Sequence, residues 1–172
     1  MPATSNTSPL IALTKTGRLR LLKELYGTVI VPPFVKGECV DKGKVIGAAD
    51  AYEIEKGVQE GWIKVVALGK KSRTRARTLT ERARIGQGEA EAIVLAKERR
   101  LLVILDDAEA RAVARGLGVQ HMGTVMVPYV AFVRRLISRQ ELVAILADLS
   151  RVLWISPTVI AEVLRMAQEG RK

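Results

Sequence analysis

Carboxylate side chains stand at three places in the chain where a strand gives way to a helix or a helix begins. Glu38 follows a short β-branched strand, Glu89 opens a helix, and Asp106 and Asp107 close a buried apolar strand. Because ligand sites form beyond the carboxyl ends of parallel strands, we expect these acids to meet at one edge of a sheet. Such oxygen ligands favour Mg²⁺ or Mn²⁺. The chemistry they predict is metal-assisted cleavage of a phosphodiester.

Each acid also has an ordinary structural explanation. Glu89 shares a helical face with Ala92, Ile93 and Ala96, so its carboxylate heads an apolar stripe and needs a partner or a metal. Equally, an acid in the first turn is favoured by the helix dipole alone. One of the two adjacent aspartates should cap the next helix, which leaves the other to point into a cleft. Glu38 is the weakest candidate in isolation and depends on meeting the others.

The elements that must position these acids alternate between strands and helices. Strands are expected at residues 28–31, 62–68 and 101–105. Helices are expected at residues 8–13, 18–26, 48–61, 86–100, 107–117, 139–149 and 157–168, and after Pro32 and Gly123. This alternation predicts an α/β fold, a three-layer α/β/α sandwich with a mostly parallel central sheet. We expect a single domain over residues 1–172 with C-terminal helices at 139–170.

A basic segment at residues 69–85, where we expect a loop, departs from the composition around it. It holds one acid, Glu81, and these seven basic residues: Lys70, Lys71, Arg73, Arg75, Arg77, Arg82 and Arg84. The whole chain has a net charge of +10, which favours a polyanion as partner. The functional interpretation is an arm that grips nucleic-acid phosphates beside the acidic site. The alternative is a solvated loop.

Composition excludes several classes of protein. The single histidine, His121, excludes a histidine pair as acid and base and a zinc site with several histidines. The single cysteine, Cys39, excludes an internal disulfide. No apolar run reaches the roughly 18 residues of a membrane span, and no signal-peptide pattern is present at the start. We therefore expect a cytoplasmic protein that does not enter a membrane.

Taken in order, these landmarks resemble the PIN-domain family of metal-dependent nucleases. The likeness is to the subgroup close to VapC-like toxins of toxin–antitoxin pairs, and it covers nearly the whole chain. It is carried by residues 7–13, 29–33 with Glu38, 88–93 and 106–107, and further by residues 123–124 and the C-terminal helices.

The resemblance implies a site in which three or four acids bind Mg²⁺ or Mn²⁺ and cleave RNA. It makes Glu38 the second acid and Glu89 the third. It makes Asp107 the fourth, with Asp106 in support or as the alternative, and places Ser8 beside the first acid. It also implies a homodimer and an antitoxin protein as partner.

The sequence departs from the family pattern at the first acid, where it has Asn6. An amide oxygen can bind a hard cation but carries no charge and cannot act as a base, so metal affinity and activity should fall. Only residues 1–5 precede Asn6, so the first strand is expected to be short or to begin upstream of the printed chain.

Three functions are therefore compatible with the sequence. The first is a PIN-like endoribonuclease with metal ligands Asn6, Glu38, Glu89, Asp106 and Asp107. The second is a catalytically inactive PIN-like module that binds RNA or a protein. The third is a nucleotide-binding or response-regulator-like domain. The third is disfavoured because the chain lacks a Walker-type loop and a Gly-x-Gly-x-x-Gly turn.

Overall fold

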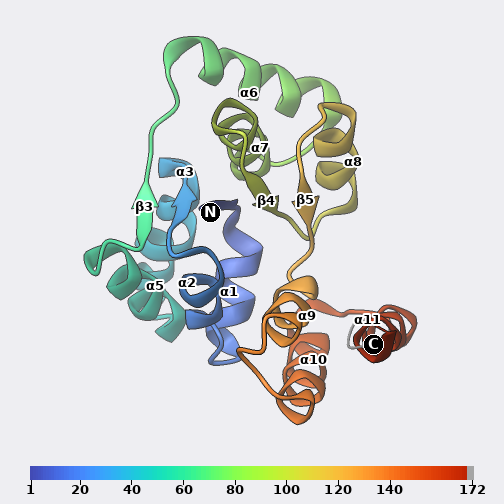
Figure 1. The fold of residues 1–172 in the computed structure, drawn as a ribbon. Helices are drawn as coiled ribbons and strands as arrows, with labels where there is room; N and C mark the ends of the chain where they lie inside the picture. The colour runs from blue at the N-terminus through green and yellow to red at the C-terminus, as the bar shows by residue number, and fades with distance from the viewer. Residues whose placement is uncertain (170–172) are drawn as a thin grey trace.

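A parallel sheet of five strands forms the centre of the computed structural model, which describes residues 1–169 (Figure 1). The strands lie in the order β3-β2-β1-β4-β5, and every pairing is parallel. Their bounds are β1 Ala3–Ser5, β2 Val29–Val31, β3 Ile63–Val65, β4 Leu102–Ile104 and β5 His121–Met122. The predicted α/β fold with a parallel sheet is confirmed.

Helices connect the strands and continue beyond β5. They are α1 Thr7–Lys15, α2 Arg20–Tyr26, α3 Pro33–Lys36, the π-helix η1 Gly37–Lys42, α4 Gly43–Val45, α5 Ala49–Gln59, α6 Lys70–Ala83, α7 Gln87–Arg99, α8 Ala108–Gly116, α9 Met126–Val133, α10 Arg139–Leu153 and α11 Pro157–Glu169. The C-terminal helices expected at 139–170 are α10 and α11, and residue 170 lies outside the described residues. None of the helices within residues 1–169 is long and apolar enough to cross a membrane.

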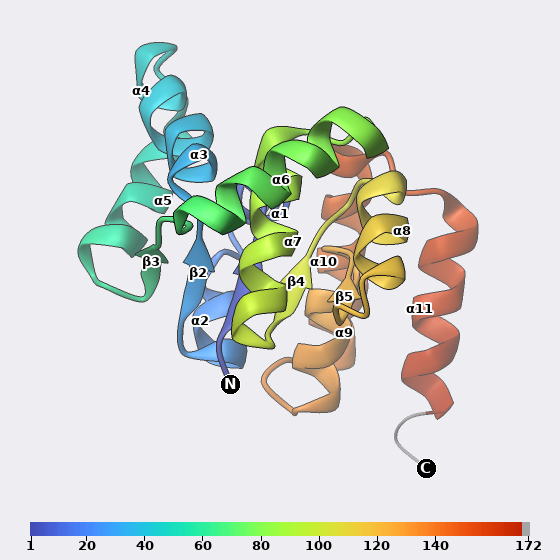
Figure 2. The same ribbon diagram turned by 90° about the horizontal axis from the view of Figure 1, so that it is seen from above.

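Strand β2 illustrates how the sheet separates two apolar layers. Val29 and Val31 belong to the larger core cluster, which also contains residues of α1, α2, α9 and α10. Ile30, between them, packs instead with Leu95 of α7. Successive strand side chains point to opposite faces of a sheet, so helices cover both faces. The result is the three-layer α/β/α arrangement, with α7 on one face and α6 on the outer side of α7 (Figure 2).

The basic segment is a helix and not the expected loop. Residues 70–83 form α6 between Gly69 and Gly86, and no glycine or proline interrupts them. Ser72 and Ala76, four positions apart, are buried against α7. The Ser72 hydroxyl also donates a hydrogen bond to the Glu98 carboxylate. The prediction was wrong because the exposed charges around this short buried stripe concealed its helical period.

The carboxyl ends of β1 and β4 bring distant parts of the chain to one edge. Ser5 pairs with Ile104, and the Asn6 backbone N–H donates to the Ile104 carbonyl at 3.4 Å. Asn6 directly follows β1 and is the N-cap of α1, while Asp106 is the second residue after β4. Residues about 100 positions apart therefore lie together at the edge where ligand sites form in parallel sheets.

Candidate functional site

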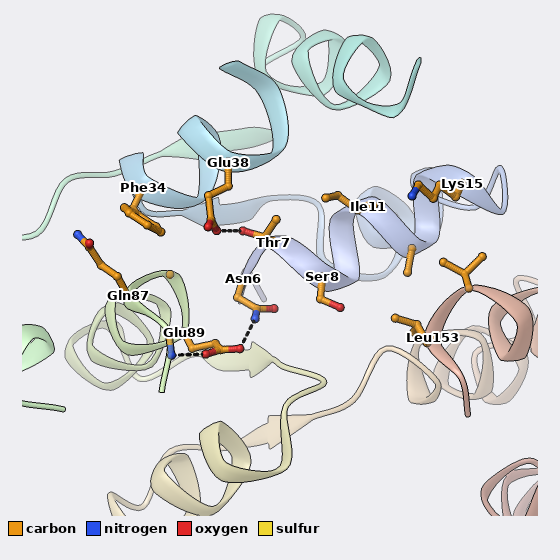
Figure 3. Close-up of a pocket in the computed structure, with 14 residues that line it drawn as sticks. Asn6, Thr7, Ser8, Ile11, Lys15, Phe34, Glu38, Gln87, Glu89 and Leu153 are labelled. Carbon is orange, nitrogen blue, oxygen red and sulfur yellow. Dashed lines mark hydrogen bonds between the residues drawn. The ribbon is translucent and has the colours of Figure 1, made fainter. Parts of the chain in front are cut away.

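A cavity of about 510 Å³ opens beyond the carboxyl end of β1 (Figure 3). Asn6 lies between its two acidic walls, with Glu38 contributed by η1 and Glu89 by α7. Ser8 also lines it, from the first turn of α1. Three of the predicted ligands and the predicted supporting serine are thus brought to one cavity by α1, η1 and α7.

Glu38 is held in the cavity by the residue that follows Asn6. The Thr7 hydroxyl donates a hydrogen bond of 2.6 Å to Glu38 Oε2. Glu38 lies on the π-helix η1, which continues the helix that Pro33 begins directly after β2. Such π-turns are rare within helices and occur frequently at functional sites. The position of Glu38 is therefore fixed both by an unusual backbone turn and by a side chain from α1.

Gly88 allows the two acidic walls to approach each other. A Cβ atom at this position would lie 3.3 Å from Glu38 Oε2 and 3.3 Å from Val35 Cγ2, closer than side chains ordinarily pack. The absence of a side chain lets the first turn of α7 lie against α3 and η1. Glu89, the next residue, is thereby placed opposite Glu38.

Glu89 is half-buried and accepts hydrogen bonds from two directions. The Gly86 backbone N–H donates to Glu89 Oε2 at 2.6 Å, and Asn6 Nδ2 donates to Oε1 at 3.5 Å. Burial raises the pKa of Glu89; the Gly86 N–H opposes the rise, and the negative charges of Asp107 and Glu38 add to it. A carboxylate so crowded by like charges is stabilised by a cation.

Asn6 presents a buried oxygen to the same place. Its side chain is 5 % exposed, and within residues 1–169 its Oδ1 has no hydrogen-bond partner. An unpaired buried acceptor costs free energy unless a donor or cation reaches it. One amide oxygen and two carboxylates, those of Glu38 and Glu89, therefore line one cavity. This set of oxygens fits a hard divalent cation.

One of the two aspartates caps the next helix, as the sequence suggested, whereas the other is not among the described residues that line the cavity. Asp107 is the N-cap of α8 and accepts from the Ala110 N–H at 2.7 Å. Asp106 accepts from Ser8 Oγ at 3.0 Å, from the Thr124 N–H at 2.8 Å and from Thr124 Oγ1 at 2.6 Å. Asp107, the expected fourth acid, acts on Glu89 through its charge. Within the described chain, the cavity lining includes neither aspartate.

The acids are neighbours without forming a closed cluster. In residues 1–169, no three side chains of His, Cys, Asp or Glu form a group that could hold a metal ion. Each of the four predicted acids accepts at least one hydrogen bond from a protein donor instead.

The predicted basic residues lie elsewhere. All seven are exposed, and six lie on α6 while Arg84 directly follows it. Within the described residues, none of them lines the cavity that holds Asn6. Arg77 forms an ion pair with Glu81 of its own helix at 2.8 Å.

Three positioning residues lie in the segments that carry the family resemblance, but they were given no role in the site from the sequence. They are Thr7, which binds Glu38; Thr124, which binds Asp106; and Gly88, which permits the close approach of the walls. Thr7 and Thr124 each come directly after a residue at or near a strand end, which is a local signal for them. The approach at Gly88 depends on tertiary packing and leaves no local signal.

Comparison with known proteins gives a match over almost the whole chain. The family model described as DUF3368, PIN domain, matches residues 2–169. No curated protein and no solved structure matches significantly. The matched range includes the sheet, the acidic cavity and both C-terminal helices. The chain belongs to the PIN-domain family.

Proposed function

We propose that this protein is a divalent-metal-dependent endoribonuclease, close to the VapC-like toxins, that cleaves RNA phosphodiesters with Mg²⁺ or Mn²⁺. The observation that carries the proposal is the arrangement of Asn6, Glu38 and Glu89 around one cavity, with the buried Asn6 Oδ1 unpaired within residues 1–169. A PIN-type fold supports nuclease chemistry. The net charge of +10 supports a polyanionic substrate.

Asn6 Oδ1 and the carboxylates of Glu38 and Glu89 would hold the ion, with Asp107 or Asp106 as a fourth ligand. Such an ion lowers the pKa of bound water and neutralises charge that develops on the phosphate. The protein's own contribution is orientation: Thr7 fixes Glu38, and the Gly86 N–H fixes Glu89. Asn6 would supply only an oxygen ligand, because an amide cannot accept a proton as a base.

A binding module without catalysis is the second candidate, and Asn6 favours it. An amide replaces the first acid of the family pattern. The remaining carboxylates already accept hydrogen bonds from donors of the protein. Such a module would bind RNA, or an antitoxin-like protein, with an affinity indifferent to EDTA. If the protein is a VapC-like toxin, we also propose an antitoxin partner and a homodimer. Light scattering after size-exclusion chromatography tests the homodimer.

Calorimetric titration with Mn²⁺ separates the two candidates when it is paired with an RNA-cleavage assay. We expect Asn6→Asp to raise Mn²⁺ affinity and cleavage more than about tenfold, because it adds a charge among the ligands. Adding Glu89→Gln should abolish both gains. Glu91→Gln is the matched control for the Mn²⁺ titration, since it makes the same change on the same helix outside this cavity.

Retained cleavage after Glu89→Gln would reject the proposed ligand set. Absence of Mn²⁺ binding in the Asn6→Asp variant would establish the acids as structural groups and leave the binding module as the function.

A further inference from the structure

Two further hollows lie between the acidic cavity and helix α6. A second cavity, of about 260 Å³, shares Phe34 and Gln87 with the acidic cavity. A third, of about 440 Å³, shares Gln87, Glu91 and Arg73 with the second. Because each hollow shares lining residues with the next, the hollows are neighbours on the surface, and we call the three together the α6 groove. It runs from Asn6 past the start of α7 to α6.

Arg73 occupies the central place in the α6 groove. It lines both the second and the third hollow. Its side chain is exposed, and among residues 1–169 it forms no ion pair. Arg77, one turn further along, lines only the third hollow and is already paired with Glu81. Of the two arginines that line the second and third hollows, Arg73 is therefore the one whose charge is less compensated.

Arg75 lies on another side of the same helix. It borders a separate cavity of about 460 Å³, together with Val94, Lys97 and Leu117. Residues two apart on a helix do not face each other, so Arg73 and Arg75 cannot contact the same stretch of a bound strand. Both are exposed and without an ion pair in the described residues. They form a matched pair that differs in position alone.

The opposite wall of the α6 groove adds a directional constraint. Glu91 of α7 borders the second and third hollows and accepts a hydrogen bond from Gln87 Nε2 at 2.9 Å. A phosphate in the groove is repelled by this carboxylate and attracted by the guanidinium of Arg73, which can bind it through two N–H groups. The charge distribution therefore favours a phosphate on the α6 side.

The geometry points to Arg73 as the residue that positions an RNA strand by binding a backbone phosphate adjacent to the acidic cavity. Arg77 is a secondary contact, and Arg75 takes no part. This inference rests on RNA as the substrate in the proposed function. It assigns to one arginine the role that the sequence distributed over seven basic residues.

Fluorescence anisotropy of a labelled oligouridine, measured in EDTA over a range of KCl concentrations, tests the assignment. Each phosphate contact contributes about 0.7 to the slope of log affinity against log salt for a single strand. We expect Arg73→Ala to reduce that slope by about 0.7 and to weaken binding. Arg73→Lys should keep the slope, because it keeps the charge. Arg75→Ala should match the wild-type protein.

Equal losses in Arg73→Ala and Arg75→Ala would overturn the assignment and indicate a diffuse basic patch. No loss in Arg73→Ala, or no binding by the wild-type protein, would also overturn it. The result is independent of catalysis because EDTA removes the metal. Cleavage without a role for Arg73 would leave the proposed function intact, whereas Arg73-dependent binding without cleavage would reject only the nuclease.

Discussion

The acidic cavity and helix α6 hold their charges in opposite ways. The carboxylates of Glu38 and Asp106 accept hydrogen bonds from groups 18 to 98 positions away in sequence, namely Thr7, Ser8 and Thr124. On α6, by contrast, the ion pair found within the described residues joins Arg77 to Glu81 of the same helix. Negative charge is fixed by the tertiary structure, and most of the positive charge of α6 is left exposed.

This difference matches two distinct demands of acting on a nucleic acid. Chemistry at one phosphate needs ligands held in place, because small displacements of catalytic groups cost rate. Binding of a backbone needs accessible cations whose contribution depends on salt. Changes in the acidic region should therefore alter stability and chemistry, and changes at exposed positions of α6 should alter affinity.

The largest effect on stability is expected at Asp106. Asp106→Ala leaves the Thr124 N–H and hydroxyl and the Ser8 hydroxyl without their acceptor, and Thr124 is fully buried. Such unsatisfied groups cost roughly 1–3 kcal/mol each, so we expect a loss of about 3 kcal/mol. Asp107→Ala removes one helix cap and should cost about 1 kcal/mol. Urea unfolding of both variants measures the difference.

Equal losses of unfolding free energy in Asp106→Ala and Asp107→Ala would mean that the hydrogen bonds of Asp106 stabilise the protein no more than an exposed helix cap does. The contrast between a fixed acidic region and an exposed basic helix would then lose its main support.

The acidic site could be predicted in outline because its residues mark element boundaries. Pro33 after a β-branched strand, Glu89 in a first helical turn, and paired aspartates after an apolar strand are local signals. The hydrogen bonds that hold them are not local. Whether Thr7 reaches Glu38, or α7 approaches η1 at Gly88, depends on sheet order and helix packing.

The fold class could be predicted from alternation, but two elements could not. Helix α6 was concealed because its buried stripe contains only the small residues Ser72 and Ala76. The two-residue strand β5 is too short to carry a period. Both are held by tertiary contacts, with α7 and with β4 respectively, and a single sequence carries little information on such contacts.

A smaller effect is expected where α6 meets α7. Ser72→Ala removes the buried hydroxyl that donates to Glu98, and a hydrogen bond of this kind contributes about 1 kcal/mol. Thr74→Ala is the control, because Thr74 is exposed and its hydroxyl bonds to the Lys70 carbonyl of its own helix. Its effect should remain within about 0.5 kcal/mol. Thermal unfolding of both proteins measures the two losses.

If Ser72→Ala loses no more stability than Thr74→Ala, α6 is attached to α7 by its apolar contacts alone. A loss comparable with that of Asp106→Ala would show that the two regions are equally fixed.

The smallest expected effect is the pH dependence that Glu89 gives to stability in EDTA. Burial, together with the charges of Asp107 and Glu38, raises its pKa above the ordinary 4.5 although the Gly86 N–H opposes the rise. Between the ordinary pKa and the raised pKa, the folded protein binds more protons than the unfolded chain. The free energy of unfolding therefore falls as the pH rises through that window. Glu89→Gln should remove this fall, and Glu38→Gln should narrow the window. Melting temperatures across the window measure both.

Arg73→Ala is the control from the other region, because guanidinium groups keep their charge throughout that range. The difference in melting temperature between Arg73→Ala and the wild-type protein should stay constant with pH. The difference for Glu89→Gln should change in favour of the variant as the pH rises. A difference between Glu89→Gln and the wild type that does not vary with pH would mean that neither burial nor the acidic neighbours raise the pKa of Glu89. The proposed cation site would then rest on the arrangement of the cavity and on the Asn6 Oδ1, which is unpaired within residues 1–169.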